Sequence, residues 1–234
     1  MVPDKSRSKV TMCYIFDKRK AIGSEQTMDQ STVHVYVFDS ISDWEYGYAA
    51  AGINNPQFQI SPGRFRVSTV ALKKTPVTTM GGIRIQPDLT LDQVSPDDSA
   101  MLILPGGTSW DQGQETEAVE VARAFLDAGV PVAAICGATA GLAGGGLLDN
   151  RKHTSNAPEY LAATGYKGAS LYQDAPAFTD DNLITASGIA PVDFARHIFK
   201  RLEIFKPEVL DAWFGLFKTG RAEYYFALMQ AMGA

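Results

Sequence analysis

The chain has few of the residues that cross-link a protein or bind metals, with two cysteines and three histidines among 234 residues. Cys13 and Cys136 lie far apart and in unlike surroundings. That arrangement is neither a disulfide framework nor the spacing of a zinc site, and it is typical of a reducing cytosol. We therefore expect no metal site, no cofactor and a cytoplasmic location.

Excess positive charge and long apolar runs are also missing. The net charge is −5 and there is no basic stripe, so we expect no nucleic-acid partner. No apolar run approaches the roughly 20 residues that a membrane helix needs. The first residues lack the apolar core of a signal peptide. We expect neither a membrane partner nor export.

The pattern of polar and apolar residues divides the chain into two parts. Residues 1–30 are polar, charged and without periodicity, which predicts a flexible N-terminal extension. Within it, residues 12–16 are a candidate edge strand, and Met28 is a candidate for the true start. Residues 31–234 are expected to form a single α/β domain. In its tail, residues 206–234, aromatic and aliphatic side chains at helical spacing predict a packing or dimer-forming helix pair.

Strand-like runs alternate with helical segments along this second part. The alternation predicts a doubly wound, parallel sheet covered by helices on both faces. We expect strands at 32–38, 65–72, 100–104, 132–135 and 183–186, a hairpin at 77–85, and helices at 46–53, 115–128, 137–148 and 192–204.

The strand at 132–135 ends at Cys136 and turns directly into small residues with helical spacing. This is the pattern of a nucleophile elbow, a sharp strand-to-helix turn that presents a reactive side chain. A cysteine at a helix N-terminus is favoured as thiolate, so we expect a depressed thiol pKa. The alternative is an inert, buried structural cysteine.

Two other strands end in residues that complement a thiol. Glu45 follows the first strand, and Gly106 and Gly107 follow the strand at 100–104. Parallel strands bring such residues to one edge of the sheet, where ligands bind. We expect the strands of Glu45 and Cys136 to be neighbours, with Glu45 protonated near neutral pH and hydrogen-bonded to the sulfur. The alternative for Glu45 is a solvated acid in the first turn of a helix.

Four motifs resemble the PfpI family, part of the DJ-one/PfpI superfamily of glutamine-amidotransferase-like proteins. They are LILPGG at 102–107, ICGA at 135–138, LLDNRKHTS at 147–155 and the Pro87-Asp88 turn. The resemblance covers about residues 32–205. It implies a flavodoxin-like sandwich with a reactive elbow cysteine, usually in a homodimer.

The resemblance also assigns roles to individual residues. Cys136 matches the nucleophile and Glu45 the acid that hydrogen-bonds it, with Asp43 as the alternative if the register differs. Gly107 and Gly137 match the backbone donors of an oxyanion hole, and we count Gly106 among the binding residues. Trp44 and Trp110 are candidates to roof the pocket.

The departures from the family concern histidine. Protease-like members carry histidine after the cysteine, where this chain has Gly137, and members assigned glyoxalase or deglycase activity carry one where Asn156 stands. Glutaminase domains add a late His-x-Glu pair, whereas this region holds only His197. His153 is the candidate third catalytic residue, although strand alternation could turn it to either face. Asn156 becomes a pocket candidate.

Two classes of function follow. The favoured one is a cysteine-dependent enzyme acting on a small carbonyl, amide or nitrile-like compound, with Cys136 as nucleophile and Glu45 as proton shuttle. The alternative is a non-catalytic thiol sensor or stress protein in which Cys136 oxidises to a sulfinate. A glutamine amidotransferase is less favoured than either.

Lacking a His-x-Glu pair, the protein should not hydrolyse glutamine. We expect ammonia release from glutamine to match that of a Cys136→Ala control in a coupled assay. Ammonia release that depends on Cys136 would show that a base outside the motif, such as His153, completes a triad.

Overall fold

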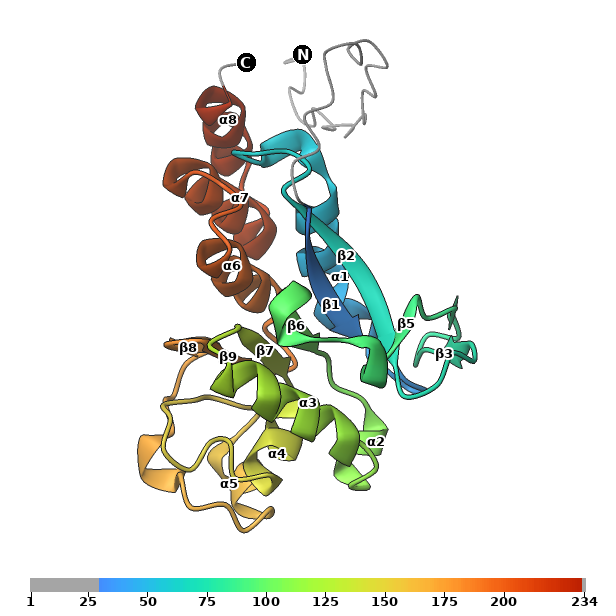
Figure 1. Ribbon diagram of the computed structural model, residues 1–234. Coiled ribbons are helices and arrows are strands. Elements are labelled where there is room, and N and C mark those ends of the chain that lie inside the picture. The colour runs from blue at the N-terminus through green and yellow to red at the C-terminus, as the bar shows by residue number, and fades with distance from the viewer. Residues whose placement is uncertain (1–29, 233–234) are drawn as a thin grey trace, which may run out of the picture.

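A mostly parallel β-sheet forms the centre of the molecule (Figure 1). The computed structural model describes residues 30–232. Its strands are β1 (Ser31–Tyr36), β2 (Phe65–Ala71), β3 (Val77–Thr78), β4 (Arg84–Ile85), β5 (Leu89–Thr90), β6 (Ser99–Leu104), β7 (Val132–Ile135), β8 (Ala177–Asp180) and β9 (Leu183–Ala186). Seven of these described strands pair in the order β5-β2-β1-β6-β7-β9-β8, and β3 and β4 form a separate antiparallel hairpin. Within the large sheet β8 runs antiparallel to β9.

Helices cover both faces of the sheet, as the sequence predicts. On one face, α1 (Asp43–Asn54) packs against α6 (Pro191–Arg201), and on the other α3 (Thr116–Asp127) packs against α4 (Gly137–Gly144) (Figure 1). The remaining helices are α2 (Thr108–Asp111), α5 (Pro158–Ala162), α7 (Pro207–Thr219) and α8 (Ala222–Ala231), with 3-10 turns at Pro56–Phe58, Leu91–Gln93, Pro96–Asp98 and Ala169–Leu171. The doubly wound architecture is thus confirmed. No helix within residues 30–232 has the length and apolarity to cross a membrane.

The central strands are buried on both sides. All four residues of β7 and the last four of β6 are fully inaccessible. Strands covered by helices on both faces need apolar side chains in both directions, which explains the continuous apolar runs. Each such Val, Leu or Ile contributes about 1.5–3 kcal/mol on burial. This core fixes the strand ends from which the site is built.

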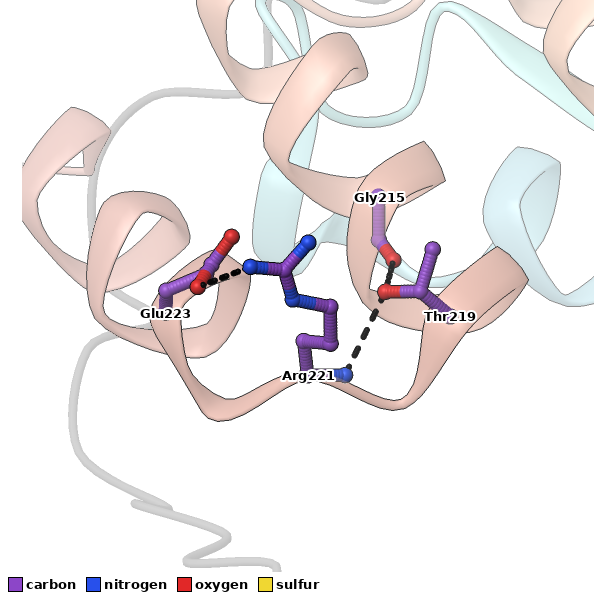
Figure 2. Close-up of polar contacts among 4 residues, drawn as sticks. All are labelled: Gly215, Thr219, Arg221 and Glu223. Atoms are coloured by element: carbon purple, nitrogen blue, oxygen red, sulfur yellow. Dashed lines mark hydrogen bonds and ion pairs between the residues drawn. The ribbon is translucent and has the colours of Figure 1, made fainter.

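The C-terminal tail forms the predicted helix pair, α7 and α8, which pack against each other beside α6. Figure 2 shows the turn between them: the Thr219 hydroxyl donates to the Gly215 carbonyl and accepts from the Arg221 backbone N–H. Arg221 also pairs with Glu223. Gly220 ends α7 with a φ of 68°, a left-handed conformation that glycine adopts without strain. A dimer role for this pair stays a prediction.

Three local expectations differ from the structure. The antiparallel strand β8 is not predicted by the sequence. The helix expected to reach residue 148 ends at Gly144, because glycines follow and Gly146 takes a φ of 74°. The short strand expected to carry His153 within 149–156 is instead an isolated bridge between His153 and Tyr172 within the described residues. The expectations for residues 1–29, which include the candidate strand at 12–16 and the start at Met28, lie outside the described residues.

Two glycines in α1 make the packing of this helix testable. A Cβ at Gly52 would lie 2.2 Å from Cζ of the fully buried Phe199, whereas one at Gly47 would meet nothing within 4 Å. We expect Gly52→Ala to destabilise the fold by about 1–3 kcal/mol through overpacking. The matched control Gly47→Ala should stabilise it by about 0.5–1 kcal/mol through helix propensity. Urea unfolding measures both, and equal effects would contradict the packing of α1 on α6.

Candidate functional site

The site lies where the order of the strands reverses. From β1 the chain first adds β2 on one side and later β6 on the other, so the carboxyl ends of β1 and β6 flank a topological switch point. The strand β7, which ends before Cys136, pairs with β6 and β9. The expectation that the strands of Glu45 and Cys136 are neighbours is therefore wrong, since β6 lies between them.

Cys136 occupies the predicted elbow. It is the N-cap of α4 and has φ 58° and ψ −124°, a strained conformation for any residue other than glycine. Its backbone N–H bonds to the Ala186 carbonyl at 3.0 Å, which continues the pairing of β7 with β9 into the turn. The side chain is partly exposed, so the elbow presents a thiol that a ligand can reach.

Glu45 reaches Cys136 across the end of β6 because Gly106 has no side chain. The Gly106 N–H donates to Glu45 Oε2 at 2.5 Å. A Cβ at Gly106 would lie 2.7 Å from the Cys136 Cβ and 2.8 Å from Glu45 Oε2. A Cβ at Gly188 would likewise lie 2.7 Å from Cys136 Sγ and 3.2 Å from Glu45 Oε1. The thiol and the carboxyl group thus meet in a space left open by two glycines.

Gly107 and Gly137 line the cavity in front of the thiol, where the family resemblance expects oxyanion donors. A Cβ at Gly107 would lie 2.5 Å from Cε2 of Phe38, so this position also needs glycine. Gly106 differs, because its N–H is already bonded to Glu45. We therefore correct its expected role: Gly106 supplies space and holds the acid.

Asn156 and Trp44 lie at the cavity as expected. Asn156 Nδ2 donates to Cys136 Sγ at 3.4 Å, and its Oδ1 accepts from the Gly188 N–H at 2.8 Å. Trp44 is half exposed on the rim, and its Nε1–H donates to the Gly188 carbonyl at 3.1 Å. Asn156 thus connects the thiol to the loop after β9.

Trp110 does not roof the cavity, contrary to expectation. It is buried, and its Nε1–H donates to the Pro105 carbonyl at 2.9 Å. A Cβ at Gly141 would lie 2.3 Å from Cε3 of its indole ring. Trp110 therefore packs α4 against the loop that carries Gly107.

His153 lies away from the thiol, which corrects its expected place as a catalytic residue. It is fully buried, with Nδ1 2.8 Å from the Arg151 carbonyl and Nε2 3.1 Å from the Tyr166 hydroxyl. The rings of Tyr166 and Tyr172 pack edge-on against it. His197 pairs with Thr179 at 2.7 Å, and none of the three histidines lines the cavity.

Burial governs the charge of Glu45, which is 1% exposed. Burial raises the pKa of this carboxyl group to about 7. Hydrogen bonds with Gly106, Cys136 and Ser42 lower the pKa, but their effect is smaller than that of burial. The carboxyl therefore changes charge near neutral pH, in the expected direction. Asp43, the alternative acid, instead accepts from the Gly81 N–H at 2.7 Å and fastens the β3–β4 hairpin.

The expectation of a depressed thiol pKa is wrong. Burial and, next, the negative charge of Glu45 raise the pKa of Cys136 to about 11, although donors from Asn156 and Gly137 oppose them. A helix N-terminus contributes at most about 2 kcal/mol. Burial can shift a pKa by several units, and a carboxylate at contact adds to it. While Glu45 is ionised, Cys136 thus keeps its proton at neutral pH.

The cavity has a volume of about 630 Å³. Gly188 follows β9 and could have been found by the same rule that found Gly107, a glycine directly after a buried strand. Asp111 and Tyr160 carry no signal in the sequence. Lining residues that the sequence analysis missed are Ser42, Met80, Thr108, Asp111, Tyr160, Gly188, Ile189 and Pro191. Residues 30–232 hold no group of three or more His, Cys, Asp or Glu side chains placed to bind a metal ion.

Both the sequence and the structure of this chain are similar to those of known proteins. The family model described as DJ-1/PfpI family matches residues 31–201. The "Uncharacterized protease YoaZ" of Bacillus subtilis is 42% identical over 208 residues, 88% of this chain and 99% of its own. "Deglycase PfpI" of Pyrococcus furiosus is 36% identical over 43% of this chain and 61% of its own. The crystal structure of a thiJ/pfpI family protein from Bacillus anthracis has a TM-score of 0.81 and 44% identity, and the match covers 89% of this chain and all of that one.

The raised pKa of Glu45 predicts that the wild type loses stability as pH rises. Unfolded, the carboxyl has its ordinary pKa of 4.5, so the native state binds the extra proton between pH 4.5 and about 7. Above pH 7 the ionised group costs about 3 kcal/mol. Glu45→Gln keeps an acceptor for Gly106, so we expect it to be about 3 kcal/mol more stable than wild type at pH 8 and equal to it near pH 4.5.

Urea unfolding at both pH values measures this difference. The matched control is Asp43→Asn, two residues away in the same helical turn. Burial works to raise the pKa of Asp43, but hydrogen bonds from Thr79 and Gly81 outweigh it and lower the pKa. That variant should therefore be less stable than wild type at pH 8. A Glu45→Gln gain that does not change with pH would contradict a titrating carboxyl.

Proposed function

The chain belongs to the DJ-1/PfpI family, and from its site we propose that it is a cysteine-dependent enzyme acting on a small carbonyl, amide or nitrile-like compound. Cys136 is the nucleophile and Glu45 the proton shuttle. The observation that carries the proposal is a buried carboxyl group with a pKa of about 7 beside a thiol on a strained elbow. Relatives named protease and deglycase support hydrolase-type chemistry.

The two oxygens of Glu45 have separate tasks. Oε2 is held by the Gly106 N–H, while Oε1 is buried, has no hydrogen-bond partner among the described residues, and lies with Cys136 Sγ around the space left by Gly188. As Cys136 Sγ bonds to the electrophilic carbon, its proton passes to Oε1. A base with a pKa near the working pH suits this transfer. The protonated carboxyl then returns the proton to the leaving group or the adduct.

Backbone donors receive the charge that develops on the substrate. When Sγ adds to a carbonyl carbon, the π electrons move to the oxygen, which needs hydrogen-bond donors about 3 Å away. Gly107 and Gly137 line the cavity next to the thiol and belong to backbone that is held in place by Phe38 and Trp110. Such donors are preorganised, so they need no rearrangement during the reaction.

The position of Glu45 beside the thiol favours the enzyme over the sensor. Oxidation by peroxide requires the thiolate, and burial together with the charge of an ionised Glu45 raises the pKa of the Cys136 thiol. An enzyme does not need a resting thiolate, because Glu45 takes the proton as the substrate reacts. One observation keeps the sensor as second candidate: the Asn156 amide lies 3.4 Å from the sulfur, where it would stabilise a sulfinate.

We expect Cys136→Ser to abolish turnover of a panel of small carbonyl, amide and nitrile compounds. Glu45→Gln should lower kcat by about 10²- to 10⁴-fold, the usual contribution of a general base. His153→Asn is the control, because His153 lies outside the cavity, and its kcat per folded molecule should stay within about twofold. Steady-state kinetics with intact-mass detection of a Cys136 adduct measures all three.

Turnover that survives Cys136→Ser would refute the role of Cys136 as nucleophile. A large loss of kcat in His153→Asn would show that His153 takes part in catalysis after all. If no compound turns over, peroxide titration tests the second candidate function, the thiol sensor. Two oxygens added selectively at Cys136 would favour the sensor.

A further inference from the structure

The cavity in front of Cys136 is acidic and partly apolar. Among its lining residues Glu45 and Asp111 carry carboxylates, and none is a lysine, arginine or histidine. Trp44, Met80 and Ile189 expose large apolar surfaces around it. An anionic substrate would therefore enter against the charge of Asp111, and against that of Glu45 when it is ionised, with no cation among the lining residues to compensate.

Asp111 is an exposed acid at the cavity that one hydrogen bond orients. It ends α2, and the hydroxyl of Tyr160 in α5 donates to its Oδ1 at 2.5 Å. Its Oδ2 has no hydrogen-bond partner among the described residues and stays available to a ligand. Burial raises the pKa of Tyr160, and the charges of Asp111, Cys136 and Glu45 add to that rise, so these groups share one electrostatic environment.

We propose that Asp111 is a specificity-determining residue that selects substrates carrying a positive charge near the electrophilic carbon. The substrate class is then a cationic carbonyl, amide or nitrile compound, such as one bearing an ammonium group, and this assignment rests on the proposed function. The Asp111 carboxylate pairs with the cation, and the indole face of Trp44 on the rim offers a second favourable contact. Anionic compounds of the same size are disfavoured.

A set of three alkylating probes isolates charge from shape. The probes are iodoacetamides whose nitrogen carries a 2-(trimethylammonio)ethyl group, its neutral isostere 3,3-dimethylbutyl, or an anionic 2-sulfoethyl group. In each, Cys136 Sγ displaces iodide: the S–C bond forms, iodide leaves with the C–I electron pair, and the thiol proton passes to solvent through Glu45. Mass spectrometry of the peptide that contains Cys136 gives the rates, separately from Cys13.

In wild type at low salt we expect the cationic probe to react fastest and the anionic probe slowest. The cationic-to-neutral ratio should be about two- to fivefold, the effect of one partly exposed charge. Salt should reduce this ratio. Equal rates for the cationic and neutral probes would overturn the proposal.

Asp111→Asn removes the charge but keeps an acceptor for Tyr160, so the cationic-to-neutral ratio should fall to about one. Tyr160→Phe keeps the charge and should retain a preference for the cation. The matched control is Asp97→Asn, an exposed acid that precedes β6 at the opposite edge of the sheet, and it should leave the ratio unchanged. An unchanged ratio in Asp111→Asn would refute the role of this residue.

Alkylation needs no turnover, so the two proposals fail separately. A charge preference that depends on Asp111, without turnover of any compound, would refute the enzyme and leave the selective cavity standing. Turnover that depends on Cys136, without a charge preference, would refute only the role of Asp111.

Discussion

The contact between Glu45 and Cys136 depends on a missing side chain in the middle of the sheet. The two residues follow strands that are separated by β6, so they can meet only across the end of that strand. Gly106 stands there, and a Cβ in its place would lie 2.7 Å from the Cys136 Cβ and 2.8 Å from Glu45 Oε2. Any larger residue would push the acid from the thiol. The same glycine donates its N–H to the acid, so one position supplies both the space and the orientation.

Two features of the site destabilise the folded state, and burial of the core has to offset this free energy. A buried carboxylate disfavours the folded state above neutral pH by about 3 kcal/mol, a large fraction of the 5–15 kcal/mol that stabilises a typical domain. The positive φ of Cys136 adds strain of order 1–3 kcal/mol. Cys136 directly follows β7, and the Glu45 carboxyl lies at the end of β6, where the Gly106 N–H holds it. The residues of β7 and the last four of β6 are fully buried. A strained elbow and a buried acid persist only where such packing holds them.

Sequence patterns predicted those features that depend on local order along the chain. Apolar runs predicted the central strands, and the ends of those strands pointed to Cys136, Glu45 and Gly107, because parallel strands bring their carboxyl ends together. The raised thiol pKa could not be predicted, since it depends on burial and on contact with a carboxylate 91 positions away in sequence, from Glu45 to Cys136. The pair of Asp111 and Tyr160, 49 positions apart, likewise exists only in the fold.

The replacement of a family histidine by Asn156 connects the geometry to the chemistry. An amide donates hydrogen bonds but does not take a proton at neutral pH, so Asn156 can orient Cys136 Sγ and cannot act as its base. His153 cannot substitute for it, because both of its ring nitrogens are engaged elsewhere. Under the proposed function the proton of Cys136 passes to Glu45, the buried carboxyl group beside the thiol, whose pKa lies near neutral pH because it is buried. If the proposed function holds, a site with asparagine in place of the histidine depends on the buried acid, and with it on Gly106, which leaves the space for the acid to reach the thiol.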